Sequence, residues 1–268
     1  MNEIKFFLKF GEREYLERFQ KGNLFFSNAQ TFRYYEENLF IKGQGDHLEG
    51  GSMITASNMT MIDNNSNEPV FTGVRVNVIY YFKPANLLPV FCLFACFEKD
   101  CLVKDDGTLS IELSEDIKQN IIAHFPKADT VAIIKKPQQF IDDVRSTIVT
   151  ECKSDLINYF HLLGFDSEQG RANDLSYFKY LSQGAPPNKE NERLCYSIKS
   201  KDIYRSLLCK DLFFKKEQEY RFILPQMNIT KSREFPVRLN ESIELQDLSY
   251  FFSQKTNLKI DRQEALYS

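Results

Sequence analysis

The stretch "PVFCLFACF", Pro89 to Phe97, decides the fold that this sequence predicts. Successive side chains of a strand point to opposite faces, and here both sets of side chains are apolar. A strand that is apolar on both faces must be covered on both sides, so we expect it at the centre of a sheet. The run before it, "VRVNVIYYF" from Val74 to Phe82, alternates and predicts a half-buried strand.

Helical patterns and further strands surround this central run. Apolar residues at helical spacing predict helices at residues 12–22, 114–125, 137–149, 154–164, 200–210 and 245–254. Gly22 suits the end of the first helix, and Pro137 suits the first turn of the third. Other apolar or alternating runs predict strands, with their turns, at residues 4–11, 23–32, 130–136, 213–224 and 232–239.

The order of these elements favours an α+β fold. Strands and helices do not alternate regularly, as they would in a doubly wound protein. We expect a mixed, largely antiparallel sheet with flanking helices, in a single domain that spans residues 1–268. Long polar loops are expected near residues 33–52 and 165–195.

The composition indicates a globular protein with an aromatic core. The chain has 24 Phe and 13 Tyr but no Trp, and aromatic rings favour strands. A formal net charge of −3 supplies no basic field, so binding of nucleic acid would have to be local. There is no apolar signal segment, and the longest apolar run, about eleven residues, is too short to span a membrane. We expect a cytoplasmic protein with no membrane partner.

Cysteine usage and missing motifs argue against several classes of site. The six cysteines form no C-x-x-C pair, and the three histidines do not cluster with them in sequence. We therefore expect reduced thiols and no zinc site. The sequence also lacks a P-loop, a G-x-G-x-x-G turn, a G-x-S-x-G elbow and an H-E-x-x-H helix, which argues against the enzymes that use them.

The first candidate site lies in "FFKKEQEYRFIL", Phe213 to Leu224. Read as a strand, this run places Glu217, Glu219 and Arg221 on one face and its aromatic residues on the other. Residues two apart on a strand lie roughly 6.5–7 Å apart at their Cα atoms. Two carboxylates at that spacing repel each other, and an arginine can offset the charge of one of them through a bidentate pair. The face could stabilise a cationic or hydroxyl-bearing ligand, or it could be a salt-bridged edge in water.

The second candidate site is the loop "GDHLEGG", with Asp46, His47 and Glu49. A carboxylate and imidazole cluster of this kind could bind a divalent metal or act as acid and base. The alternative is a hydrophilic surface turn. Lys9 is a third candidate, because its charge interrupts an apolar strand and points either out of the sheet or into a site.

Aromatic and histidine side chains provide weaker candidates. The tyrosines could stack on a base or on a nicotinamide ring, namely Tyr34, Tyr35, Tyr177 and Tyr180. His124 and His161 lie on apolar helical stripes and are interpreted as packing residues.

The layout resembles a group of uncharacterised bacterial proteins. The segments that carry the resemblance are "FLKFGEREYLERFQKGNLFFSNAQTF", "GDHLEG", "PQQFIDDV" and "FKKEQEYRFIL". They span roughly residues 5–225. Such proteins are associated with bacterial defence or toxin–antitoxin neighbourhoods. The resemblance implies an antiphage-defence or toxin-type effector, with an unknown macromolecular acceptor or a partner protein of a defence system.

The opening of the chain and its Glu-x-Glu pair are also similar to ADP-ribosyltransferase folds. That resemblance implies NAD as cofactor, Glu219 as the residue that holds the nicotinamide ribose, and Glu217 as the residue that orients the acceptor. Such a reaction passes through an oxocarbenium-like transition state, which a fixed carboxylate stabilises. Lys9 stands where the family has Arg or His, either Tyr34 or Tyr177 would stack on the ring, and the family's Ser-Thr-Ser strand is missing.

Three functions therefore stay open at the level of sequence. The first is NAD-dependent ADP-ribosyl transfer or NAD cleavage, with Glu219, Glu217 and Arg221 as catalytic residues and Lys9, Tyr34, Tyr177, Asp46 and Glu49 as cofactor-binding residues. The second is a metal-dependent nuclease or phosphodiesterase. The third is a non-catalytic sensor or interaction module, in which basic residues engage the two glutamates.

Overall fold

The chain folds around one six-stranded antiparallel sheet. The structure is a computed structural model, and it describes residues 3–39, 48–62, 66, 68–103, 108–162, 176–184, 188–190, 193–195, 197–253 and 256–258. From one edge to the other, the strands are β16 (Glu244–Asp247), β8 (Thr130–Ile134), β1 (Ile4–Gly11), β5 (Val90–Phe97), β14 (Glu219–Ile223) and β9 (Lys153–Leu156). The prediction of a central strand at 89–97 and of an α+β fold with a largely antiparallel sheet is confirmed.

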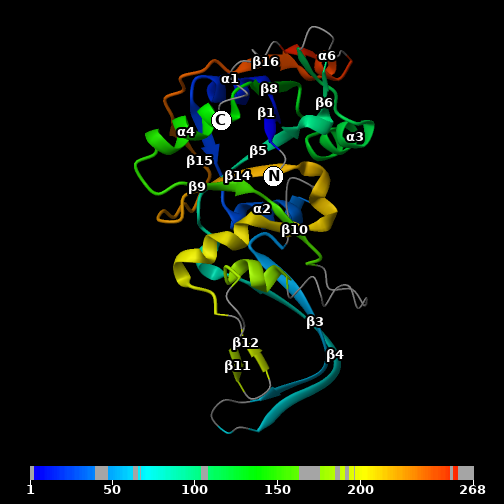
Figure 1. Ribbon diagram of the computed structural model, residues 1–268. Coiled ribbons are helices and arrows are strands. Elements are labelled where there is room, and N and C mark those ends of the chain that lie inside the picture. The colour runs from blue at the N-terminus through cyan, green and yellow to red at the C-terminus, as the bar shows by residue number, and fades with distance from the viewer. Residues whose placement is uncertain are drawn as a thin grey trace.

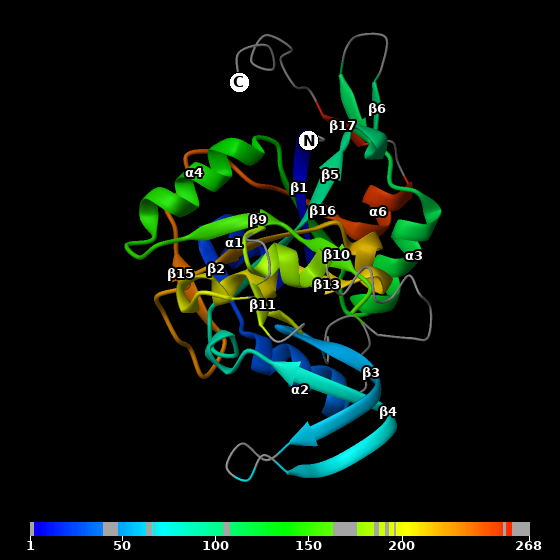
Figure 2. The ribbon, with the colours of Figure 1, turned by 60° about the horizontal axis from the view of Figure 1, so that its bottom comes forward.

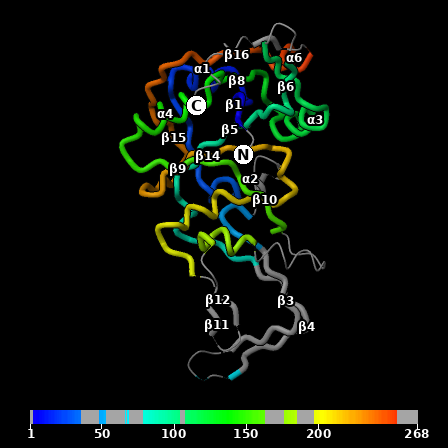
Figure 3. Tube along the Cα trace, in the orientation of Figure 1, coloured from blue at the N-terminus to red at the C-terminus, as the bar shows by residue number. Residues whose placement is uncertain are grey.

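Helices cover both faces of this sheet (Figures 1 and 2). On one face, α1 (Arg13–Gln20) and α4 (Pro137–Thr147) pack on a core that includes Phe7, Phe91 and Phe222. On the other face, α3 (Glu115–His124) and α6 (Leu248–Ser253) pack on a second core. The strands β1 and β16 come from opposite ends of the chain and lie in the same sheet, as the trace in Figure 3 shows.

Smaller sheets and turns surround the central one. The paired strands are β2 (Asn23–Phe26) with β15 (Arg233–Pro236), β3 (Gly51–Ile62) with β4 (Pro69–Tyr81), β10 (Asn158–Phe160) with β13 (Cys209–Asp211), and β11 (Asn188–Glu190) with β12 (Arg193–Cys195). A three-stranded sheet contains β17 (Thr256–Leu258), β7 (Leu109–Ile111) and β6 (Cys101–Val103). The other helices are α2 (Ala29–Leu39) and the 3₁₀ helices η1 (Lys83–Ala85), η2 (Glu98–Asp100), η3 (Ser200–Leu208) and η4 (Leu212–Glu217).

Several sequence predictions of elements are wrong. The helix expected at 154–164 is instead β9 and β10, because β9 extends the edge of the sheet beside β14 and β10 pairs with β13. The loop expected near 33–52 contains the end of α2 and the start of β3, while residues 40–47 lie outside the described part. Within 165–195, residues 176–181 are helical and β11 pairs with β12. The helix expected at 245–254 begins only at Leu248.

Other local predictions are confirmed. The strand at 4–11, the helix that ends before Gly22, the helices behind Ser114 and at Pro137, and the strand at 233–236 all occur in the structure. None of the described helices is both long and apolar enough to cross a membrane.

Candidate ligand pocket

The stretch Phe213 to Leu224 is not one continuous strand, contrary to the sequence prediction. The 3₁₀ helix η4 ends at Glu217, Gln218 adopts the left-handed conformation with a φ of 42°, and β14 begins only at Glu219. The buried Gln218 side chain donates to Oδ2 of Asp100 at 3.0 Å, which fixes this turn. Glu217 therefore does not share a strand face with Glu219, whereas the aromatic face of β14 packs in the core as expected.

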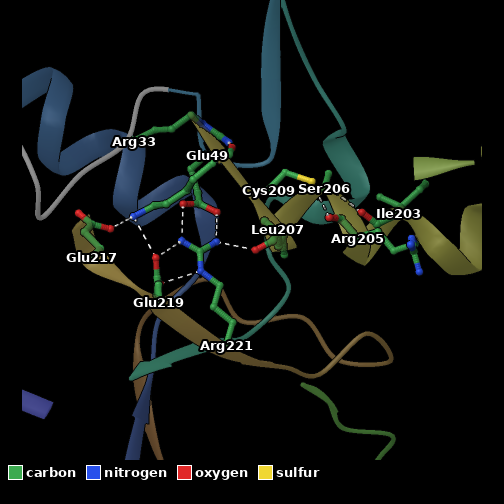
Figure 4. A network of polar contacts seen from close by, with 11 residues as sticks. Arg33, Glu49, Ile203, Arg205, Ser206, Leu207, Cys209, Glu217, Glu219 and Arg221 are labelled. Atoms are coloured by element: carbon green, nitrogen blue, oxygen red, sulfur yellow. Dashed lines mark hydrogen bonds and ion pairs between the residues drawn. The ribbon is translucent and has the colours of Figure 1, made fainter. Parts of the chain in front are cut away.

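Arg221 lies at the centre of a buried ionic network (Figure 4). Its side chain is 1% exposed, and its guanidinium donates to Oε1 of Glu219 at 2.7 Å and to Oε2 of Glu49 at 2.9 Å. It also contacts Oε1 of Glu49 and donates to the carbonyl of Leu207 at 2.6 Å. A guanidinium has five N–H donors in a planar fork, which suits two carboxylates at once.

Lys210 of β13 joins Glu217 to the same network. Its ammonium lies 2.5 Å from Oε2 of Glu217 and 3.0 Å from Oε2 of Glu219. The other oxygen of Glu217 lies 3.5 Å from Nδ1 of His124, which ends α3. The two glutamates that the sequence singled out are thus brought together by Lys210 and not by strand spacing.

The pKa directions indicate that Glu219, Lys210 and Arg221 are ionised. Burial acts to raise the pKa of Glu219, but Arg221 and Lys210 outweigh it and hold the pKa far below its ordinary value. Burial acts to lower the pKa of Lys210, and Glu217 and Glu219 raise it well above the usual range. The pKa of Arg221 is likewise raised despite burial, chiefly by Glu219 and Glu49.

A pocket of about 280 Å³ opens beside this network, where two strands of the sheet part. β1 pairs with β5 only as far as Leu8 opposite Phe94, and beyond that point β1 pairs with β8 alone. The start of β5 pairs instead with Ser27, which forms a bridge to Val90. This change of neighbour leaves a fork between β1 and β5.

Lys9 occupies the fork. Its ammonium donates to the carbonyl of Cys92 at 2.9 Å and lies 4.6 Å from the centre of the Phe91 ring. The side chain takes the place of the ladder hydrogen bonds that continued pairing would supply. Lys9 therefore lines the pocket, which is one of the two positions that the sequence left open.

The pocket has apolar walls, a charged end and an aromatic mouth. Apolar lining comes from both sides of the fork and from α3: Leu8, Phe10, Phe94, Ile121 and Phe125. The charged end consists of Lys9, Glu49, Lys210, Glu217, Glu219 and Arg221. The lining residues Phe25 and Tyr35 are 52% and 36% exposed, so the pocket meets solvent between aromatic rings.

The other residues that the sequence predicted for the site do not all lie at the pocket. Glu49 belongs to the network, but Asp46 and His47 lie outside the described residues. Tyr34 is exposed on α2, and Tyr177 is fully buried against Phe160, so neither of them lines the pocket.

Sequence reasoning missed Lys210, Cys92 and His124 as members of the site. A signal existed for Lys210, which interrupts the apolar run "LLCKDLFF" as Lys9 interrupts its strand. Cys92 lies on β5 opposite Arg221, and burial raises the pKa of its thiol. The thiol is therefore neutral and not a nucleophile at ordinary pH.

Within the described ranges, no group of three or more His, Cys, Asp or Glu residues is arranged to hold a metal ion. The cysteines described there are free thiols. Comparison of this chain with protein-family models, curated proteins and solved structures finds no match.

Proposed function

We propose that this protein is a binding module for a small molecule, which lies in the pocket at the fork between β1 and β5. The pocket itself carries this proposal, because it joins apolar walls to a small number of convergent charged groups. That combination is the usual form of a small-molecule site in proteins. The ionic network around Arg221 then shapes one end of the pocket, and the protein acts as a sensor.

The contacts of Glu219 favour binding over ADP-ribosyl transfer. A glutamate that holds a ribose and stabilises an oxocarbenium ion needs an oxygen that can reach the sugar. Both oxygens of Glu219 already accept hydrogen bonds from Arg221, and Oε2 also pairs with Lys210. NAD-dependent transfer, and with it an antiphage or toxin role and its partner protein, stays a prediction.

The size of the pocket also favours binding of a small molecule over ADP-ribosyl transfer from NAD. Its volume of about 280 Å³ lies just below the range of roughly 300–1,000 Å³ typical of drug-sized ligands. A small aromatic or aliphatic molecule is compatible with that volume, whereas a whole dinucleotide such as NAD is too large to be enclosed.

The test uses N-phenyl-1-naphthylamine, a neutral dye that fluoresces in apolar surroundings. The variant Ser232→Trp places a ring at a partly exposed position of the pocket wall, and Ser197→Trp places the same ring at an exposed position outside it. We expect saturable binding by the wild type and by Ser197→Trp, and at least tenfold weaker binding by Ser232→Trp. Circular dichroism checks that each variant is folded.

Unchanged dye binding by folded Ser232→Trp would overturn the proposal, since the dye would then bind elsewhere. A parallel assay incubates the protein with NAD and measures released nicotinamide. If the wild type releases nicotinamide and the folded variant Glu219→Gln does not, the protein is instead an enzyme that cleaves NAD.

A further inference from the structure

The three cations at the charged end of the pocket differ in their partners. Arg221 is paired with Glu49 and Glu219, and Lys210 is paired with Glu217 and Glu219. Lys9 is different: among the residues that the structure describes, no carboxylate oxygen lies within 4.0 Å of its ammonium. Among the described residues, its one hydrogen-bond partner is the carbonyl of Cys92. An ammonium has three donors, so two of them are available to a ligand.

The surroundings of Lys9 stabilise an ammonium without a carboxylate of the described residues in contact with it, although the charge of Glu219 acts on its pKa from beyond 4.0 Å. The carbonyl of Cys92 and the face of the Phe91 ring both attract a cation, but neither carries a full negative charge. Burying an unpaired charge costs free energy, and here burial lowers the pKa of Lys9 below its ordinary 10.5. An anionic ligand group beside Lys9 would offset that cost.

The carboxylates of the network do not offer an equivalent site for a cationic ligand. Glu49 and Glu219 are held by the guanidinium of Arg221, and Glu217 is held by Lys210 and faces His124. Oε1 of Glu217 accepts no hydrogen bond within the described part of the chain, whereas a cationic ligand at Glu49 or Glu219 would have to displace a partner. An anionic ligand needs only the donors that Lys9 already presents.

We propose that the natural ligand is a small aromatic or aliphatic anion, a carboxylate or a phosphate monoester, whose anionic oxygens accept hydrogen bonds from Lys9. Its apolar body lies against Phe94 and Phe125 and reaches the rings of Phe25 and Tyr35 at the mouth. This inference rests on the proposed function, because it names the ligand class of the same pocket. It makes Lys9 the residue that determines head-group specificity.

The experiment compares ligands of one shape and different charge. 2-Naphthoate, the neutral 2-naphthamide and 2-naphthyl phosphate each compete with the dye N-phenyl-1-naphthylamine for the wild type, for Lys9→Met and for the exposed control Lys127→Met. We expect the wild type and Lys127→Met to prefer an anion over the amide by at least about tenfold, which is the scale of one charge-assisted hydrogen bond. In Lys9→Met the ratio of anion affinity to amide affinity should fall to about one, because the charge-assisted hydrogen bond is lost.

The two anions show whether the pocket prefers a carboxylate or a phosphate monoester as the head group. A preference for the naphthoate assigns a carboxylate, and a larger, equally Lys9-dependent preference for the phosphate assigns a phosphate monoester. Equal affinity of the wild type for anions and amide would overturn the inference, as would a preference that survives in Lys9→Met. In both cases the proposed function stands, because the dye still binds. If the dye does not bind the pocket at all, both proposals fall.

A measurement on the wild type alone covers the case in which Lys9→Met does not fold. Naphthoate affinity should fall as pH rises, with a midpoint below 10.5, while naphthamide affinity stays constant. Lys210, Arg221 and Glu219 do not titrate in this range, since the pKa values of Lys210 and Arg221 are raised and that of Glu219 is lowered. Burial also raises the pKa of the Cys92 thiol. Constant naphthoate affinity from pH 7 to pH 10.5 would count against Lys9 as its partner.

Discussion

At the scale of single residues, Arg221 is a buried cation that is paired with two buried carboxylates. It is 1% exposed and is the only described cation that contacts both Glu49 and Glu219. A buried ion pair is weak evidence of net stabilisation, because two charges lose their hydration. Removal of one partner is different, since it leaves the other charge buried and uncompensated.

We predict that Arg221→Met lowers the free energy of unfolding by about 3–5 kcal/mol, because two buried carboxylates lose their shared partner. Urea denaturation measures this loss. The double variant Arg221→Met with Glu49→Gln should be destabilised by less than the sum of the two single variants, because it removes one of the stranded charges. A loss below about 1 kcal/mol for Arg221→Met would contradict the buried geometry.

Glu219 supports a pH prediction. Its pKa in the folded protein lies below the ordinary 4.5, so its contribution to stability is present above pH 4.5 and is lost as pH falls through the folded value. We predict that Glu219→Gln is less stable than the wild type at pH 7 and that this difference shrinks as the pH falls below 4.5. Unfolding curves of the two proteins between pH 7 and pH 2.5 give the comparison. A difference that is independent of pH would argue that Glu219 is not ionised.

At the scale of elements, the turn that joins α1 to β2 depends on glycine. Gly22 has a φ of 90°, and a Cβ atom there would lie 2.1 Å from the carbonyl oxygen of Val237. The backbone of Val237 also donates to the carbonyl of Gly22 at 2.7 Å. The turn therefore ends the helix and also holds the segment after β15 against it.

Gly184 supplies the matched control for this turn. Its φ is 73°, and no atom of the described part of the chain lies within 4 Å of a Cβ atom built there. We predict that Gly184→Ala costs about 1 kcal/mol from backbone strain alone, and that Gly22→Ala costs about 2–4 kcal/mol because the clash with Val237 is added. Thermal and urea unfolding measure both. Equal costs would show that the close approach to Val237 relaxes without effect.

At the scale of the whole molecule, the pocket links segments that are far apart in the chain. Its lining runs from Leu8 of β1 through Phe94 of β5 and Ile121 of α3 to Ser232. A ligand that binds all of these only in the folded protein must stabilise the fold as a whole.

We predict that N-phenyl-1-naphthylamine at a hundred times its Kd stabilises the wild type by about 2.7 kcal/mol, which corresponds to a rise in Tm of roughly 5–10 °C. Differential scanning calorimetry measures the shift. Ser232→Trp should show little or no shift at the same dye concentration. An unchanged Tm for the wild type under saturating dye would mean that the dye does not bind the folded state preferentially.

The sequence by itself determined the elements whose signals are local. The apolar run of β5, the stop at Gly22 and the proline that opens α4 were predicted correctly, because strand periodicity and helix ends depend on neighbours in the chain. The amphipathic pattern of α3 belongs to the same class, and so do β1 and β8. These elements were enough to predict an α+β fold with a mixed, largely antiparallel sheet and residues 89–97 as a central strand.

Only the tertiary structure decided the site and the short edge elements. Glu49 reaches Arg221 across 172 positions of the chain, and Lys210 joins Glu217 to Glu219 from a different strand. The segment at 153–160 forms strands because it pairs with β14 and β13, although its own pattern favours a helix. Spacing in the sequence carries no record of such partners, since ion pairs, short strands and a fork between strands depend on which distant segments become neighbours when the chain folds.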